Sequence, residues 1–195
     1  MNTTLAAYAD AAGSEVIEHL RQLARPLSGS KVVHVNSTAV GGGVAEILNR
    51  LIPLKRELGI QASWELIEGN QEFFAVTKKF HNTLQGDPAP VSKAALATYQ
   101  EVNRRNAERL EKTLSEADFV IIHDPQPAAM TKDIGQRKGK WAWRCHIDVS
   151  RPYRPVWKYL REFVQMYDAS IFSMAAFAQR LDHPQYLIPP SIDPL

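Results

Sequence analysis

Residues 31–52 of the chain, KVVHVNSTAVGGGVAEILNRLI, contain an apolar run, a glycine-rich turn and an amphipathic segment in succession. The β-branched run from Lys31 to Asn36 predicts a buried strand. Residues 37–43 are small and predict a turn. The next apolar residues fall on one helical face, namely Val44, Ile47, Leu48, Leu51 and Ile52. A strand that leads through glycines into a helix is a unit of sheets covered by helices.

The same alternation continues on both sides of this stretch. Apolar spacing predicts helices over residues 14–24, 73–84, 91–114 and 153–166, and strands over 62–67, 118–123, 141–147, 169–173 and 186–188. Pro53 lacks a backbone donor and is expected to kink or end the helix that follows the glycines. Strands alternating with helices favour an α/β fold, a Rossmann-like three-layer sandwich with a mostly parallel sheet.

Length, charge and cysteine content restrict the class of protein. The chain has 195 residues, 45% of them hydrophobic, so one domain with a full core is expected over residues 1–188. The three prolines within residues 189–195 indicate the start of a linker. A net charge of +2 does not favour nucleic acid or an anionic membrane as partner. Cys145 has no disulfide partner and no signal peptide is visible, so we expect a cytoplasmic protein.

The glycine turn at Gly41, Gly42 and Gly43 is a candidate phosphate loop. The amides of a helix N-terminus carry partial positive charge, and glycines allow a ligand to approach the backbone. A dinucleotide fingerprint requires a small residue where Glu46 stands, and the lysine of a P-loop is absent. The alternative is a tight turn without a ligand, although three glycines in a row cost backbone entropy.

Polar residues follow two of the predicted strands at the point where each strand ends. The carboxyl ends of parallel strands meet in one crevice, so these residues should face the glycine turn. Carboxylates, imidazoles and guanidinium groups bind sugar hydroxyls, and the candidates are His123, Asp124, Gln126, Arg144, His146 and Asp148. The alternative is that the histidines cap strands and bond to nearby backbone. No spacing of His, Cys or Asp suggests a metal site.

Four stretches resemble the family-4 retaining glycosyltransferases, and within them the trehalose glycosyltransferring synthases. They are VNSTAVGGGVAEILNRLIPLKRELG, VIIHDPQPAAM, WRCHIDVSRP and LIPPSIDPL, in the order of the family. The resemblance implies the N-terminal domain of a GT-B fold, in which two Rossmann-like domains face a cleft. It implies a retaining transfer of glucose from nucleoside diphosphate glucose to free glucose, with no metal or cofactor.

The resemblance also implies roles for individual residues. The glycines Gly41, Gly42 and Gly43 would lie near the donor phosphates. Acceptor hydroxyls would be held by His123, Asp124, Gln126, Arg144 and Asp148. A catalytic role is implied for His146 beside the reacting carbon, and for His123 and Asp148. The enzyme would act by orientation and charge stabilisation, without a protein nucleophile.

Relative to that family we expect the C-terminal donor domain to be absent from this chain, because residues 189–195 match the hinge that leads into it. We therefore expect an acceptor-side half that is inactive alone, works with its own donor domain, and could dimerise through the exposed cleft wall. Two alternatives remain open at this stage. One is a trehalose phosphorylase or another family-4 enzyme, and the other is a non-catalytic sugar-binding or regulatory module.

Overall fold

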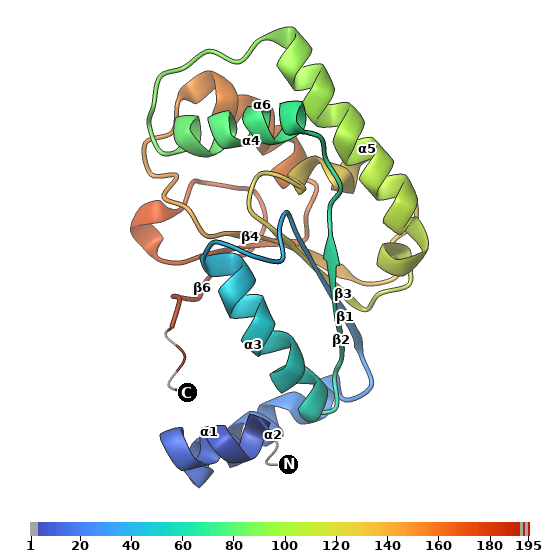
Figure 1. Ribbon diagram of the computed structural model, residues 1–195, viewed down its shortest axis with the longest axis vertical. Coiled ribbons are helices and arrows are strands. Elements are labelled where there is room, and N and C mark those ends of the chain that lie inside the picture. Colours follow the sequence, from blue (N-terminus) through green and yellow to red (C-terminus); the bar gives the residue numbers. More distant parts are fainter. Residues whose placement is uncertain (1–3, 192, 194) are drawn as a thin grey trace.

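The computed structural model describes residues 4–191, 193 and 195, and its centre is a sheet of six parallel strands (Figure 1). The strand order is β2-β1-β3-β4-β5-β6. The strands are β1 (Lys31–Asn36), β2 (Gln61–Leu66), β3 (Phe119–His123), β4 (Lys140–Cys145), β5 (Ala169–Phe172) and β6 (Gln185–Leu187). Every neighbouring pair is parallel, as the alternation of strands and helices predicts.

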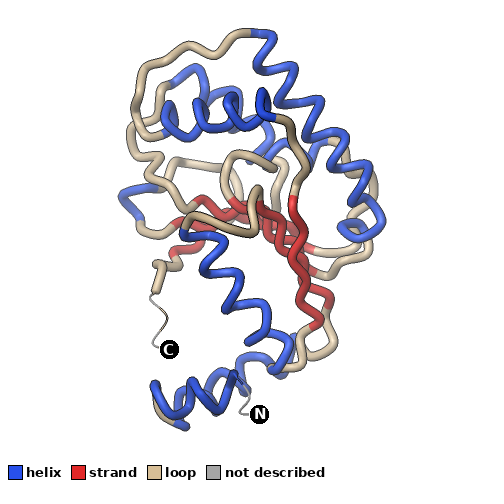
Figure 2. Tube along the Cα trace, viewed as in Figure 1, coloured by secondary structure: helices blue, strands red, loops and turns tan. Residues whose placement is uncertain are grey.

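Helices cover the two faces of the sheet unequally (Figures 1 and 2). One face carries α4 (Gln71–Leu84), α5 (Lys93–Ser115) and α6 (Arg154–Val164). The other carries α3 (Gly43–Glu57), with α1 (Thr4–Ala12) and α2 (Ser14–Ala24) beside it. Three short 3₁₀ turns complete the described elements: η1 (Arg25–Leu27), η2 (Ala128–Lys132) and η3 (Ala175–Phe177). We call these two sides the α5 face and the α3 face.

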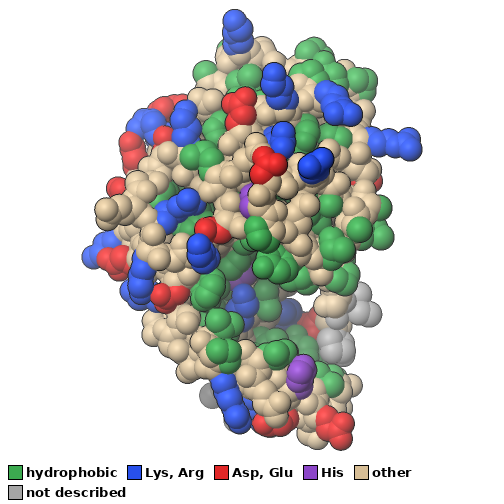
Figure 3. Space-filling model, turned by 180° about the vertical axis from the view of Figure 1, so that it is seen from behind, with side chains coloured by type: hydrophobic (Ala, Val, Ile, Leu, Met, Phe, Trp, Pro, Cys, Tyr) green, Lys and Arg blue, Asp and Glu red, His purple; other side chains and the backbone are tan. Residues whose placement is uncertain are grey.

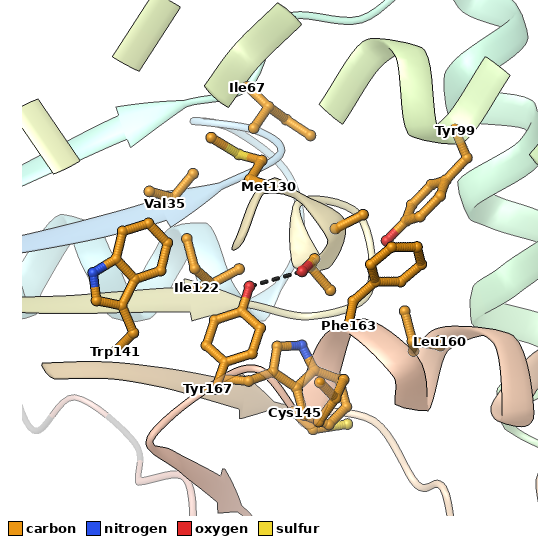
Figure 4. Packing of buried hydrophobic residues seen from close by; sticks show 14 of the residues in the cluster. Val35, Ile67, Tyr99, Ile122, Met130, Trp141, Cys145, Leu160, Phe163 and Tyr167 are labelled. Atoms are coloured by element: carbon orange, nitrogen blue, oxygen red, sulfur yellow. Dashed lines mark hydrogen bonds between the residues drawn. The ribbon is translucent and has the colours of Figure 1, made fainter. Parts of the chain in front are cut away.

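Each face of the sheet has its own apolar core. Along β1, Val33 and Val35 join the large cluster of the α5 face, while Val32 joins the smaller cluster under α3. Figure 4 shows the large cluster from close by, with the rings of Tyr99 and Phe163 next to one another. Because side chains alternate along a strand, the residue between Val33 and Val35 belongs to the α3 face.

The sheet has a topological switch point between β1 and β3. The chain leaves β1 toward β2 on one side, and returns through α4 and α5 to β3 on the other side. In open parallel sheets, a ligand crevice lies outside the carboxyl ends of the strands at such a point. The end of β1, the end of β3 and the adjoining end of β4 therefore define the place for a site.

Most sequence-based boundaries agree with the structure to within about two residues, and the two larger differences concern α3 and α1. The helix α3 continues through Pro53 to Glu57, because the exposed ring sits on the solvent side of the helix. The helix α1 was not predicted, since its small residues give a weak apolar stripe. The expected hinge at residues 189–195 lies partly outside the described residues. Within the described part of the chain, none of the helices combines the length and apolar character needed to cross a bilayer.

Candidate functional site

The turn after β1 is shaped by its own polar side chains. Asn36 donates to the carbonyl of Thr38 over 3.0 Å and accepts the N–H of Ser37 over 2.7 Å. Thr38 Oγ1 donates to the carbonyl of Val40 and accepts its N–H. These short-range bonds are typical of turns built by Asn and Thr. These bonds fix the direction in which the backbone enters the glycine turn.

The glycines begin α3 with open space around them. Gly41 has φ +72° and Gly42 has φ +96°, and a Cβ at Gly41, Gly42 or Gly43 would meet no atom within 4 Å. Gly42 is the N-cap and provides no side-chain hydrogen bond to the first turn. The first amides of α3 are therefore left without a side-chain cap, which suits an anionic group at this end of the helix.

Gly43 also borders a pocket of about 510 Å³ between α3 and the segment that follows β6. Its wall includes Glu46 and Arg50 of α3 and Pro190 of that segment. Figure 3 shows the molecule from behind, with acidic and basic side chains mixed over its surface and a recess in the lower half. The sequence-predicted phosphate loop thus opens onto a hollow rather than onto a packed interface.

Asp124, the first residue after β3, is buried in a conformation that non-glycine residues avoid. It is 8% exposed and has φ +62°. Its N–H donates to the carbonyl of Arg144 over 2.8 Å, and one carboxylate oxygen accepts the N–H of His146 over 2.8 Å. Trp143 Nε1 donates to its carbonyl over 2.9 Å. Strained backbone held by several bonds is a frequent feature of functional sites.

Buried side chains also hold the carbonyls that follow Asp124. Tyr99 donates to Pro125 over 2.7 Å, and Asn103 donates to the Gln126 carbonyl over 3.0 Å. Tyr167 donates to the carbonyl of Ala128 over 2.8 Å, which is the dashed bond in Figure 4. Hydrogen bonds from buried side chains therefore fix the backbone of residues 124–128, as a preorganised binding loop requires.

Three histidines form a diagonal row on the α3 face. In the sheet register His34 of β1 pairs with Ile121, and His123 lies two residues further along β3. His123 pairs with Arg144, and His146 lies two residues beyond that position after β4. Steps of two residues keep the side chains on one face. The row therefore runs from the middle of β1 to the edge of the sheet where the strands have their carboxyl ends.

These imidazoles are joined to one another and to a lysine by hydrogen bonds. Lys55 Nζ lies 2.8 Å from His34 Nε2, and His34 Nδ1 lies 2.9 Å from His123 Nε2. His123 Nδ1 lies 2.9 Å from His146 Nε2. The rings stack, with centroids 5.2 Å apart at both contacts. We call these four residues the Lys55–His146 chain.

Burial shifts the ionisation of these groups. It lowers the pKa of His34 and His123 well below the usual value, helped by the charges of Lys55 and Arg144. Burial, followed by the Arg144 charge, lowers the pKa of His146 to about 4 and that of Lys55 to about 8. The three imidazoles are therefore neutral near neutral pH, and Lys55 remains mostly an ammonium.

The pKa of Asp124 moves in the opposite direction from those of the histidines. Burial raises it to about 7, although the N–H of His146 and the nearby Arg144 charge oppose the shift. A carboxyl with this pKa changes protonation near neutral pH. Such perturbed groups in a crevice are candidates for binding or catalytic roles.

The other predicted site residues occupy different positions around this edge. The Gln126 amide oxygen is buried without a hydrogen-bond partner in the described part of the chain. Asp148 accepts the N–H of Ser150 over 2.8 Å, which closes a local turn. Arg144 Nη2 donates to the carbonyl of Ile188 over 3.0 Å, on the segment that follows β6. An unpartnered buried amide oxygen is a position that a ligand hydroxyl can satisfy.

The structure adds residues that the sequence pattern did not single out. The sequence predicted His123 and His146 as separate site residues, and the structure joins them to His34 and Lys55 in one hydrogen-bonded row. A histidine inside the valine-rich strand β1 was the available signal for His34. The imidazoles point at one another rather than at a common centre, and the described residues contain no cluster of three or more ligands suited to a metal ion.

The sequence of the chain matches a family described as "Trehalose synthase, N-terminal domain" over residues 34–179. It is 47% identical over 191 residues to a protein of Pyrococcus horikoshii named trehalose synthase, covering 96% of this chain and 45% of that protein. It is 43% identical over 195 residues to a trehalose synthase of Rubrobacter xylanophilus, covering 98% of this chain and 47% of that protein. The chain thus spans about half the length of the relatives it matches.

A solved structure has a related fold. It is a UDP-forming α,α-trehalose-phosphate synthase of Burkholderia xenovorans in complex with glucose-6-phosphate. The match has a TM-score of 0.58 at 17% identity, and covers 76% of this chain and 41% of that one. At this identity the likeness establishes the fold, the α/β arrangement expected for one half of a GT-B protein.

Proposed function

We propose that this chain, which belongs to the family of trehalose synthase N-terminal domains, is the acceptor-binding half of a retaining glycosyltransferase. The reaction would join glucose from nucleoside diphosphate glucose to free glucose and so make trehalose. Residues 1–188 would form the acceptor domain, and residues 189–195 would begin the hinge to a C-terminal donor domain. This division accords with the coverage of about half of each relative.

The observation that carries the proposal is the bond between the Asp124 carboxylate and the His146 N–H, at the switch point of the sheet. Both residues lie within the part matched to the family. The bond fixes one oxygen of the titratable Asp124 carboxyl and ties it to the backbone of the residue that carries the neutral His146 imidazole. Sugar hydroxyls need a donor and an acceptor at short range, and this pair offers both.

In this proposal the acceptor glucose lies over residues 124–126 and against His146. Asp124 and the unpartnered amide oxygen of Gln126 accept hydrogen bonds from its hydroxyls. Arg144 and Asp148 flank the same edge and contribute further polar groups. Because the loop carbonyls are already held by Tyr99, Asn103 and Tyr167, glucose binding requires little ordering of the protein.

The donor phosphates would lie at Gly41, Gly42 and Gly43, where the uncapped amides of α3 and the open space around the glycines admit an anion. The chain would stabilise charge on the leaving diphosphate and orient the acceptor. No protein nucleophile enters this scheme. His123 would act through His146 rather than on the sugar, because both of its ring nitrogens are engaged by other histidines.

The test is an assay of trehalose formation from nucleoside diphosphate glucose and glucose. It uses this chain joined to its donor domain, with uridine, adenosine and guanosine donors compared in parallel. The proposal predicts trehalose and free nucleoside diphosphate in equal amounts, and no turnover by residues 1–195 alone. Reaction only from trehalose with inorganic phosphate would instead identify a phosphorylase. Robust synthesis by the isolated chain would refute the division of labour.

A further inference from the structure

The Lys55–His146 chain runs from the interior of the protein to the proposed acceptor site. Lys55 belongs to α3, His34 to β1 and His123 to β3, while His146 follows β4. His34 and His123 are 3% and 2% exposed, and His146 is partly exposed at the carboxyl edge. A residue of a covering helix is thus connected to the site through three hydrogen bonds.

The ammonium group at the inner end determines the direction of these bonds. A lysine ammonium can only donate, so His34 Nε2 accepts from Lys55 and the proton of the neutral ring lies on Nδ1. His34 Nδ1 then donates to His123 Nε2, and the His123 proton lies on Nδ1 as well. By the same argument His123 Nδ1 donates to His146 Nε2.

The outer ring nitrogen of His146 is Nδ1. Because its Nε2 accepts from His123, the proton of neutral His146 lies on Nδ1. That nitrogen makes no hydrogen bond to the described part of the chain. It is therefore available as a donor at the carboxyl edge, beside the carboxylate of Asp124 that holds the His146 backbone.

Burial, helped by nearby positive charges, keeps the three imidazoles of the Lys55–His146 chain neutral. The facing groups are Lys55 from α3 and Arg144 from β4, both cationic, and the histidines face one another. A second proton on His123 would sit on its Nε2, where it would face the N–H of His34 Nδ1, which also donates. With one proton on the Nδ1 of each ring, every hydrogen bond of the row has one donor and one acceptor.

We propose that Lys55 is a positioning residue, whose ammonium sets the tautomers of His34, His123 and His146 in turn and thereby makes the outer nitrogen of His146 a hydrogen-bond donor. The tautomer assignment stands independently of the enzyme's substrate, whereas the benefit to catalysis rests on the proposed function. Without Lys55 the direction of the hydrogen bonds between the three histidines can reverse, so that His146 Nε2 donates to His123 and His123 Nε2 donates to His34. His146 would then present an acceptor to the sugar in place of a donor.

The first experiment reads the tautomers in the 195-residue chain by NMR. Long-range ¹H–¹⁵N correlation spectra of ¹⁵N-histidine-labelled protein distinguish protonated from unprotonated ring nitrogens near neutral pH. The wild-type protein should show all three rings protonated on Nδ1. A wild-type His34 or His146 protonated on Nε2 would overturn the proposal without any variant.

Variants then test whether Lys55 is the cause. Lys55→Met removes the donor and keeps an unbranched chain, so His146 should change to the Nε2-protonated form. Lys55→Arg keeps a group that can only donate and should retain the wild-type pattern. The matched control is Lys79→Met on the exposed side of α4. Retention of the Nδ1 form in folded Lys55→Met, judged by amide spectra, would overturn the causal role.

A second experiment links the tautomers to catalysis in the two-domain protein. Lys55→Met should lower kcat on the order of a hundredfold, as expected for loss of one oriented donor, with Lys55→Arg restoring most of it. Unchanged kcat despite altered tautomers would overturn the positioning role and leave the proposed function intact. Absence of trehalose synthesis by the wild-type protein would instead refute the proposed function, while the NMR result still decides the tautomers.

Discussion

The carboxylate of Asp124 accepts the backbone N–H of His146 at 2.8 Å, and this bond joins the ends of β3 and β4 at the proposed acceptor site. The same aspartate has a left-handed backbone, with φ +62°. Two separate contributions are therefore combined at one residue, a hydrogen bond that stabilises the site and a backbone strain that opposes it. Each can be measured by substitution.

Replacing Asp124 separates those two contributions. Asp124→Ala and Asp124→Gly both lose the carboxylate, but only alanine retains the cost of a left-handed backbone. We expect Asp124→Gly to be more stable than Asp124→Ala by about 1–2 kcal/mol. Urea unfolding of the two variants measures the difference. Equal stabilities would show that the positive φ is not a strained conformation in the folded protein.

The histidine row predicts a loss of stability on acidification. Below pH 6.5 the unfolded chain protonates its histidines, whereas burial lowers the pKa of folded His146 to about 4 and also lowers the pKa values of His34 and His123 well below the usual value. The unfolded state thus binds more protons, and stability falls as the pH drops from about 6.5 toward 4. Each excess proton contributes roughly 1.4 kcal/mol per pH unit.

Asp124 contributes to this pH dependence with the opposite sign. Its folded pKa is raised from 3.8 to about 7, so between these values the folded state binds the extra proton. Three histidines outweigh one carboxyl, and acidification remains destabilising overall. The slope measured by urea unfolding at several pH values should decrease by up to one proton in His146→Gln. The comparison variant is His19→Gln, which replaces a histidine exposed on α2. Equal slopes in both variants would contradict the buried neutral row.

The glycine turn can be tested with two adjacent alanine substitutions. Gly42 has φ 96° and ψ 149°, a region available almost only to glycine, so Gly42→Ala should cost about 1–3 kcal/mol. Gly43 is the first residue of α3 and has open space around its Cβ position, so Gly43→Ala should leave stability unchanged or slightly higher.

Gly43→Ala also isolates the proposed role in donor binding. A methyl group there would obstruct the approach of a phosphate to the α3 amides. In the two-domain protein, we expect a higher KM for nucleoside diphosphate glucose with thermal stability maintained. An unchanged KM for the donor would argue against a phosphate at this turn.

The loop after Asp124 is predicted to depend on buried tyrosines. Tyr99→Phe leaves the carbonyl of Pro125 without its partner in a fully buried position, which should cost about 1–3 kcal/mol. Tyr186→Phe is the matched control, because Tyr186 is 55% exposed on β6. Thermal or urea unfolding of both variants gives the comparison. A loss no larger in Tyr99→Phe than in Tyr186→Phe would contradict a fixed loop.

Most of the fold could be predicted from the sequence because local patterns and global packing agree. The strand Lys31–Asn36 and the helix Ser14–Ala24 were predicted with the bounds that the structure has. The strand at β4 was predicted over 141–147 but ends at Cys145, where the His146 N–H turns to the Asp124 carboxylate. Side-chain capping of this kind depends on a neighbouring strand and leaves no mark in local hydrophobicity.

The site could be predicted only in part. That His123, Asp124 and His146 gather at one edge follows from the rule that parallel strands end together. That Lys55 reaches His34 does not, because its place depends on how α3 packs over β1. A lysine two residues from the end of a helix that ends in charged residues has the pattern of a surface residue. The direct contact of His123 with a sugar, implied by family resemblance, stays a prediction, and the indirect role proposed above rests on the bonds of its two ring nitrogens to His34 and His146.

We propose above that Asp124 belongs to an acceptor-glucose site in this half of a two-domain enzyme. Asp124→Asn keeps the shape of the residue and its tolerance of positive φ, and removes the charge. Steady-state kinetics of trehalose formation should give a kcat/KM for glucose lower by about tenfold to a hundredfold, with the KM for the nucleotide sugar little changed. The exposed Asp87→Asn should behave as wild type. A wild-type kcat/KM for glucose in Asp124→Asn would contradict the account.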